Sequence, residues 1–335
     1  MSDGNPRSPR AATAVSSRSG PASRSARAHR PAAPPCHQPR RSPTQLDGVA
    51  IIWRLARLQL IHAEAIEYRD LADEPGHVDA EAVERARKHN VGLLVVLGDA
   101  ACAGREIVFG TTHVLWNPKR GHVKLQQLAM YTRRAAALAS SRAALGHGPP
   151  PAIVLSGDFN CTPGSLLHRY LGGDVGVRAA LSSEGTWDGQ RPAHAPASAS
   201  AASAGAAGFV EPVVAFGRHA LSGALCSAYA ALGEPEVTTS HGGFEGAVDS
   251  IFYTPERLRL VDLLPTPTRA QLAATGPLPT RHVPSDHVPI AADFAWVDTW
   301  TPPLPPGPPP PLRAGPEGRP DAAPDEWPPL SRARR

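Results

Sequence analysis

Cysteine and long apolar runs are both scarce in this chain of 335 residues. Its four cysteines are widely spaced and include no Cys-x-x-Cys pair, which argues against a disulfide framework and against a zinc site of the usual spacing. No apolar stretch approaches the roughly 18 residues of a membrane span, and the N-terminus lacks the apolar core of a secretion signal. We therefore expect no membrane contact and a cytoplasmic or nuclear location. An organelle transit peptide is the alternative, because the N-terminus is rich in Arg and Ser and poor in acids.

Acidic residues are also scarce near the ends of the chain. Residues 1–45 hold eight Arg and one acid, and residues 301–335 hold five Arg, four acids and 13 of the 38 prolines. The 13 basic and five acidic residues of these ends leave 21 basic and 25 acidic residues between positions 46 and 300, a net charge of −4. Segments this poor in apolar residues cannot offset the entropy of ordering, so both ends are predicted to be disordered tails. The positive charge of the whole chain therefore indicates no basic binding face on the folded part.

The segment from 46 to 300 is long enough to bury a core and is predicted to form one folded domain. Within it, residues 192–208 are mostly Ala, Ser and Gly, a linker composition that we interpret as a low-complexity insertion. The predicted organisation is thus a tail at 1–45, a domain at 46–300 and a Pro-rich tail at 301–335.

Short apolar runs bounded by turn residues predict strands, and helical periodicity between them predicts helices. The expected helices are 79–89, 123–145 and 165–171, and the expected strands are 49–53, 58–62, 91–97, 107–113, 153–158, 249–253, 258–263 and 288–296. Some of these strands follow one another directly, while others alternate with helices. This mixture favours an α+β fold in which two packed sheets carry helices on the outside.

Three segments place His, Asp or Asn at the ends of apolar strands: 111–118, 156–160 and 285–290. Polar groups at strand ends converge at one rim of a sheet, where active sites commonly form. A single Asp or His in such a place is more often a turn former or a cap. Three such ends in one domain, one of them with Asp158 and Asn160 two positions apart, favour a catalytic site.

In their order and spacing, these segments resemble the endonuclease/exonuclease/phosphatase superfamily, and within it the Angel proteins, the carbon-catabolite-repressor type deadenylases and nocturnin. The resemblance extends from about 47 to 294. The matching segments are 47–51, 89–93, 112–125, 157–165, 227–229, 235–239, 248–253 and 285–287. Each segment is weak alone, and their common order makes the resemblance specific.

The resemblance implies a DNase I-like, four-layer α/β/β/α sandwich and Mg²⁺-dependent cleavage of phosphoesters, with Mn²⁺ as an alternative ion. It also assigns roles to individual residues. Asp158 would orient or deprotonate the attacking water, and Asn160 would hold the phosphate beside it.

Further roles follow from the same resemblance. His113 and His287 would donate hydrogen bonds or positive charge to the phosphoryl oxygens as charge builds in the transition state. Asp249 would fix the imidazole of His287, and Asp286 would face the metal directly or through water.

The chain departs from the family pattern upstream of position 47. Relatives carry there an Asn at one strand end and a metal-binding Glu in a Gln-Glu motif, whereas this chain has its Arg-rich tail and no Gln-Glu pair. Glu64 and Glu67 match no such motif and are interpreted as solvated, and Ser250 stands where relatives usually have Tyr. We therefore expect an N-terminally incomplete domain that binds Mg²⁺ weakly, in the millimolar range or beyond. We also expect an exposed sheet edge that a protein partner could cover.

A basic group, Lys119, Arg120 and Lys124, follows the first of the three strand ends and contains two of the three lysines of the chain. It is either a solvated helix start or, together with Asn117, a contact for phosphates of an RNA 3′ end. We take Asn117 and Lys124 as candidate substrate-binding residues.

The resemblance thus predicts a Mg²⁺-dependent phosphoesterase that acts on RNA 3′ ends. It would be either a 3′–5′ exoribonuclease of the deadenylase type or a 2′,3′-cyclic phosphatase of the Angel type. The alternatives are a catalytically degenerate relative that binds RNA ends or a protein partner, and a sequence that lacks its first exons.

Overall fold

The computed structural model describes residues 14–15, 36–37, 47–74, 80–146, 148–173, 220–221, 224–241, 243–276 and 278–297. These residues all belong to a unit that extends from Met1 to Trp300, and the second unit of the chain begins at Thr301. The predicted insertion at 192–208 and the predicted tail at 301–335 lie outside the described residues, as does most of 1–45. No helix in the described ranges is both long and apolar enough to cross a membrane.

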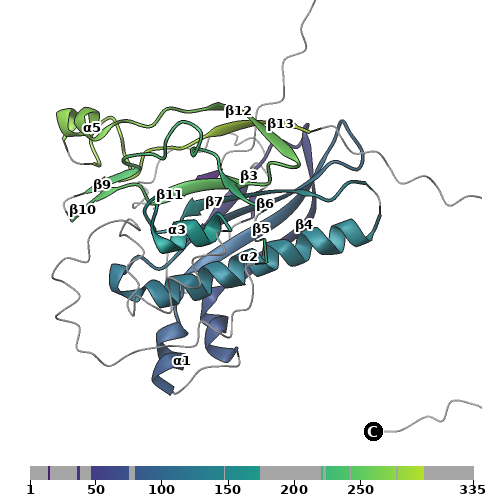
Figure 1. Ribbon diagram of the computed structural model, residues 1–335, viewed down its shortest axis with the longest axis horizontal. Coiled ribbons are helices and arrows are strands. Elements are labelled where there is room, and N and C mark those ends of the chain that lie inside the picture. The colour runs from purple at the N-terminus through teal and green to yellow at the C-terminus, as the bar shows by residue number, and fades with distance from the viewer. Residues whose placement is uncertain are drawn as a thin grey trace, which may run out of the picture. The chain divides into compact units, whose positions relative to one another are not determined.

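A six-stranded sheet lies at the centre of the first unit (Figure 1). In sheet order its strands are β4 (Leu58–Glu67), β5 (Val91–Asp99), β6 (Glu106–His113), β7 (Ala152–Asp158), β11 (Asp249–Tyr253) and β8 (Cys226–Ser227). Neighbouring strands are antiparallel except β6 and β7, which run parallel. Parallel neighbours require a crossover connection, and here it carries the long helix α2 (Gly121–Ala144).

Strand β5 is an almost continuous apolar run and is buried on both faces of the sheet. Its odd-numbered residues from Val91 to Leu97 face a core shared with the second sheet. Leu94 and Val96 face the opposite core, which includes Leu128 and Tyr131 of α2. Period-two alternation alone assigns these residues to the two cores.

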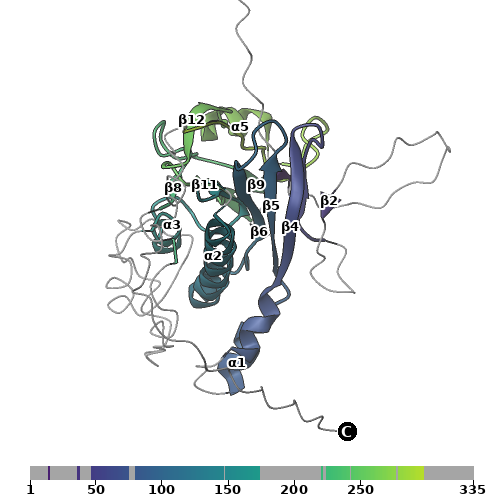
Figure 2. The same ribbon diagram turned by 90° about the vertical axis from the view of Figure 1, so that its right-hand side faces the viewer.

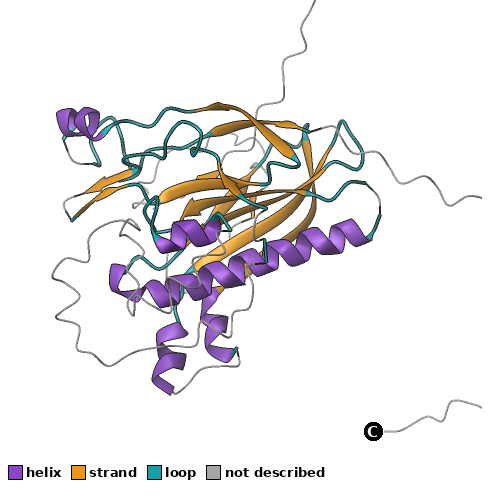
Figure 3. Ribbon diagram, in the orientation of Figure 1, coloured by secondary structure: helices purple, strands orange, loops and turns teal. Residues whose placement is uncertain are grey.

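The two cores separate the layers of an α+β sandwich (Figures 2 and 3). Helices α2 and α3 (Leu166–Leu171) lie on one side of the central sheet. On the other side lie the antiparallel pair β12 (Leu258–Leu263) and β13 (Ala292–Trp296), with α5 (Arg269–Thr275). The predicted sandwich of two sheets with outer helices is confirmed.

Short elements complete the unit. Strand β3 (Ala50–Ile52) pairs with the two-residue strands β1 (Ala14–Val15) and β2 (Cys36–His37), which lie in the segment predicted to be a disordered tail. The remaining elements are the hairpin strands β9 (Thr239–His241) and β10 (Phe244–Gly246), helix α1 (Ala80–Ala86) and the 3-10 turns Tyr68–Asp73 and Pro118–Arg120.

Two predicted strands differ from the observed ones by more than two residues at one end. The strand predicted at 288–296 begins only at Ala292. The amide of Val288 instead donates to the carbonyl of Thr238 at 2.8 Å. Strand β4 is longer than predicted and continues to Glu67. It forms an edge of the six-stranded sheet, with Leu60 and Ile61 each 41% exposed.

Candidate active site

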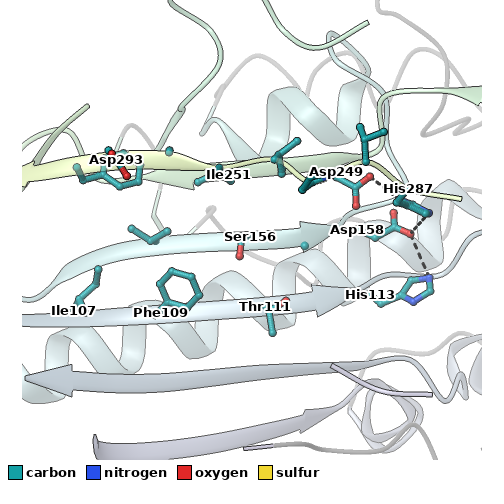
Figure 4. Close-up of a pocket in the computed structure, with 18 of the residues that line it drawn as sticks. Ile107, Phe109, Thr111, His113, Ser156, Asp158, Asp249, Ile251, His287 and Asp293 are labelled. Atoms are coloured by element: carbon teal, nitrogen blue, oxygen red, sulfur yellow. Dashed lines mark hydrogen bonds and ion pairs between the residues drawn. The ribbon is translucent and has the colours of Figure 1, made fainter. Parts of the chain in front are cut away.

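Three neighbouring strands place polar side chains in one row at the rim of the central sheet. His113 ends β6, Asp158 ends β7 and Asp249 begins β11. The strand registers pair His113 with Asp158 and Asp158 with Asp249. The parallel β6–β7 pair and the antiparallel β7–β11 pair together bring these three residues side by side (Figure 4).

His287 joins this row from a loop. An isolated bridge pairs His287 with Thr239, and the carbonyl of Asp286 accepts from the amide of Ser240 and from the hydroxyl of Thr239, at 3.1 and 2.8 Å. The loop is therefore fixed to β9. The three strand ends identified in the sequence thus meet at one rim, although they are separated along the chain.

Asp158 lies at the centre of the site with two imidazoles beside it. Its Oδ2 lies 3.4 Å from Nε2 of His113 and 4.0 Å from Nε2 of His287, and its Oδ1 accepts from the amide of Asn160 at 2.9 Å. Burial, followed by the negative charge of Asp249, raises the pKa of Asp158 to about 7. A carboxylate with this pKa exchanges protons near neutral pH, as a general base requires.

His287 is held in place and charged by its neighbours. Burial opposes its protonation, but the hydrogen bond to Asp249 and the charges of Asp249, Asp158 and Asp286 outweigh burial and raise the pKa of His287 to about 9. Its Nδ1 donates to Asp249 Oδ2 at 2.7 Å, so the imidazolium presents Nε2 to Asp158 (Figure 4). The expected Asp249–His287 pair is therefore present.

Asn160 lines the cavity beside the row and has a left-handed backbone conformation, with φ of +48°. Its side-chain Nδ2 donates to the carbonyl of Val114 at 2.9 Å, which ties the segment after β7 to the segment after β6. Close approach of these two strands also requires Gly157, because φ there is +138° and a Cβ would lie 2.1 Å from the carbonyl oxygen of Thr112.

A cavity of about 610 Å³ opens beside this row and runs between the two sheets. The side chains that line it change from apolar to polar along β6, in the order Ile107, Phe109, Thr111 and His113 (Figure 4). On β11 the same change leads from Ile251 to Asp249. The row of His113, Asp158, Asp249 and His287 therefore lies at one end of the cavity, and farther along it β6 and β11 contribute apolar side chains.

The structure corrects the position expected for Lys124. Its side chain is fully buried, and Nζ donates to the carbonyl of Asn160 at 2.8 Å. A direct contact of Lys124 with an RNA phosphate, and the alternative of a solvated helix start, are therefore both wrong for this residue. Asn117 is half-buried and is not among the residues that line the cavity, while Arg120 is exposed.

Two site residues were missed in the sequence. Trp116 lines the cavity and is 64% exposed, next to the anticipated Asn117. Thr238 is buried, and its hydroxyl donates to Asp249 Oδ2 at 2.6 Å. Trp116 could have been predicted from the sequence, because this large aromatic residue lies three positions after His113 at the strand end.

Asp286 is the carboxylate of the site that could hold a metal ion. Asp286 lines the cavity, whereas Asp249 already accepts from Thr238 and His287. Among the described residues, no group of three His, Cys, Asp or Glu side chains is arranged to hold a metal. Mg²⁺ keeps several waters and can bind through one or two carboxylates together with substrate phosphates.

The two upstream glutamates do not fill the role of a further ligand. Glu64 forms an ion pair with Arg134 at 3.1 Å, and Glu67 forms one with Arg69 at 2.6 Å. Neither glutamate lines the cavity.

Comparison with known proteins identifies the family of this chain. No family model matches the chain. Among solved structures, Angel2, a 2′,3′-cyclic phosphatase, in complex with adenosine-2′,3′-vanadate, is 30% identical, with a TM-score of 0.53 over 77% of this chain and 73% of that chain. The chain belongs to the endonuclease/exonuclease/phosphatase superfamily, in its Angel and carbon-catabolite-repressor group.

Curated members of this superfamily are also similar to the chain. It is 26% identical over 274 residues to the CCR4-Not complex 3′-5′-exoribonuclease subunit Ccr4 of Mycosarcoma maydis. This match covers 75% of this chain and 37% of that protein. It is 24% identical over 265 residues to 2′,5′-phosphodiesterase 12 of Rattus norvegicus, with coverages of 75% and 38%. The chain thus spans less than two fifths of the length of each of these superfamily members.

Proposed function

We propose that this chain hydrolyses phosphoesters at RNA 3′ ends, with the row of His113, Asp158 and His287 as its catalytic centre. The observation that supports this most directly is a buried carboxylate of near-neutral pKa that lies within 4.0 Å of two imidazoles. This arrangement combines a proton acceptor with donors for a phosphoryl group in one small volume.

In the proposed reaction, Asp158 orients a water molecule and accepts its proton as the oxygen attacks phosphorus. His113 and the imidazolium of His287 donate hydrogen bonds to the phosphoryl oxygens, where negative charge increases in the transition state. The ester bond to the leaving oxygen then breaks, and that oxygen is protonated by solvent. Asn160 holds the phosphate, and Asp249 keeps His287 charged and oriented.

A divalent cation is proposed as the cofactor, and Asp286 is the residue that would hold it together with the substrate phosphate. Bound there, Mg²⁺ or Mn²⁺ would act as a Lewis acid that neutralises charge on the phosphoryl group. The ion would be held by Asp286, water and the substrate phosphate rather than by several carboxylates. We therefore expect weak binding of the free ion, in the millimolar range or beyond.

Of the two reactions on RNA 3′ ends, we favour the opening of a 2′,3′-cyclic phosphate over stepwise removal of nucleotides. The relative that is 30% identical to this chain, Angel2, is a 2′,3′-cyclic phosphatase, whereas the exoribonuclease relative is 26% identical. Fold alone does not decide between them, because one site can serve both chemistries. Asn117 and the exposed Trp116 lie close to His113 in the chain and are the proposed contacts to the RNA end.

The test is hydrolysis of two matched RNA oligonucleotides, one ending in a 2′,3′-cyclic phosphate and one in an oligoadenylate with a free 3′-hydroxyl, each with and without Mg²⁺. Asp158→Ala should lower turnover at least about a hundredfold, the usual cost of removing a preorganised catalytic group. The matched control is Asp293→Ala, which removes an aspartate that lines the cavity far from His287 (Figure 4).

Each result decides a different part of the proposal. Turnover of the cyclic phosphate alone supports the Angel-type reaction, and shortening of the oligoadenylate alone supports the exoribonuclease. Undiminished hydrolysis in Asp158→Ala would refute the site assignment. Binding of the RNA end without hydrolysis in the presence of metal would instead favour a non-catalytic RNA-end binder.

A further inference from the structure

Among the described residues, Lys124 is a buried cation that the mechanism above does not use. It is the fourth residue of α2, and its side chain has no exposed surface. A positive charge in the first turn of a helix is unfavourable, because the N-terminal end of the helix dipole is itself positive. Burial of an ammonium group adds a further cost unless hydrogen bonds and a negative charge compensate it. The position of Lys124 therefore requires a compensating partner.

The compensating groups belong to the active site. Nζ of Lys124 donates to the carbonyl of Asn160 at 2.8 Å. Burial and the charge of Asp249 raise the pKa of Asp158, and the charge of Lys124 opposes this rise, so the carboxylate of Asp158 is a negative charge that favours the buried ammonium group. The neighbouring Cys161 cannot take this role, because burial raises the pKa of its thiol to about 12 and keeps the thiol neutral.

The contact to Asn160 completes a set of three anchors around a residue in the left-handed region. The amide of Asn160 donates to Asp158 Oδ1, its side chain donates to the carbonyl of Val114, and its own carbonyl accepts from Lys124. Asn adopts the left-handed region more readily than other non-glycine residues, and these three hydrogen bonds hold Asn160 there at φ of +48°. Lys124 thus links the N-terminal turn of α2 to the residue expected to hold the phosphate.

We propose that Lys124 is a positioning residue of the phosphoesterase site, which fixes the Asn160 backbone and balances the charge of Asp158 from behind the sheet. This inference rests on the proposed function, but its central claim concerns Asp158 and can be tested without turnover. Lys124 acts through Asn160 and Asp158 and touches no substrate itself.

The experiment compares the full chain with Lys124→Met, which keeps the length of the side chain and removes its charge and donors. Thr132→Val is the matched control, because Thr132 is equally buried on α2 and donates to the carbonyls of Leu128 and Ala129 in its own helix. Titration of the Asp158 carboxyl carbon by NMR is the first measurement, and kcat and KM on RNA with a cyclic phosphate are the second.

In Lys124→Met we expect the pKa of Asp158 to rise by about one unit, since a buried favourable charge is lost. We also expect kcat to fall about tenfold or more with KM changed by less than about threefold, because a positioned transition-state contact is lost while ground-state binding remains. Thr132→Val should leave both readouts unchanged. The titratable groups that face Asp158 and are held constant are His113, Asp249, Cys161 and His287.

An unchanged Asp158 pKa in a folded Lys124→Met variant would overturn the inference and leave Lys124 as a packing residue. If Lys124→Met fails to fold, Lys124→Gln decides, since it keeps an N–H donor for Asn160 without the charge and should still raise the pKa of Asp158. Absence of turnover in the unmodified chain would count against the proposed function alone, because the NMR titration still decides the role of Lys124.

Discussion

The hydrogen bonds of the Thr238 hydroxyl predict how much its removal lowers the stability of the protein. Thr238 is fully buried, and its Oγ1 donates to Asp249 Oδ2 at 2.6 Å. The same oxygen accepts from the backbone amides of Val248 and Asp249, at 3.0 and 3.1 Å. One hydroxyl therefore satisfies two buried donors and orients the carboxylate that holds His287.

Replacement of Thr238 by Val keeps the shape of the side chain and removes all three hydrogen bonds. Each amide left unsatisfied in a buried position costs about 1–3 kcal/mol, and a hydrogen bond to a charged group contributes about 1.5–3 kcal/mol. With the low end of each range, Thr238→Val should lower the free energy of unfolding by at least about 3 kcal/mol. Thr238→Ser keeps the hydroxyl and loses one methyl group, a change of about 1 kcal/mol.

Equilibrium unfolding in urea, followed by far-ultraviolet circular dichroism, measures both variants against the unmodified chain. At equal slope, the transition midpoint of Thr238→Val should fall well below that of Thr238→Ser. Hydrolysis should follow the same order, because only the hydroxyl keeps Asp249 and His287 aligned. Equal midpoints for the two variants would refute the hydrogen-bond argument and leave only the shape of the side chain.

Two further predictions concern Gly157 and the titration of Asp158. Gly157→Ala should lower the melting temperature and the turnover together, because a Cβ would lie 2.1 Å from the carbonyl oxygen of Thr112. An unchanged melting temperature would contradict the close approach of β6 and β7. Asp158 has a folded-state pKa of about 7, above the value of 3.8 that is ordinary for this side chain. Its contribution to stability is therefore fully present below pH 3.8 and is lost as the pH rises through 7. Asp158→Asn should therefore flatten the fall in stability across this range, and a steeper fall in the variant, measured by urea unfolding at each pH, would reverse the sign of this argument.

Local patterns were sufficient to predict the scaffold of the site. Strands β11 and β12 have the predicted bounds, because each is a short apolar run between turn residues. Helix α2 begins two residues before its predicted start, as expected for a long periodic segment with a diffuse end. The C-terminal half of β4 was missed because Ala63 and Glu64 interrupt the apolar pattern, and its pairing with β5 supplies the strand instead.

Long-range contacts explain what the sequence could not predict. The basic group around Lys124 predicted either a solvated helix start or a contact with RNA phosphates, and only the fold brings the carbonyl of Asn160, 36 positions away, to its ammonium group. The partner of Thr238 is likewise reached through the turn of the β9–β10 hairpin, which no local pattern specified. The sequence could predict the polar site residues at strand ends. It could not predict the residues that hold them by hydrogen bonds, because these contacts arise from tertiary packing.

The row of strand ends at the rim has a consequence for synthesis of the chain. His113 and Asp158 belong to a parallel pair that is complete once β7 has been made, but Asp249 follows 91 positions after Asp158 and His287 follows still later. A nascent chain on the ribosome can therefore form the crossover around α2 long before it has a binding site. The proposed affinity for a phosphate group would arise only when the loop that carries His287 leaves the exit tunnel and pairs with β9. Capture of stalled nascent chains by a phosphate analogue would consequently report the completion of the domain rather than its first folding step.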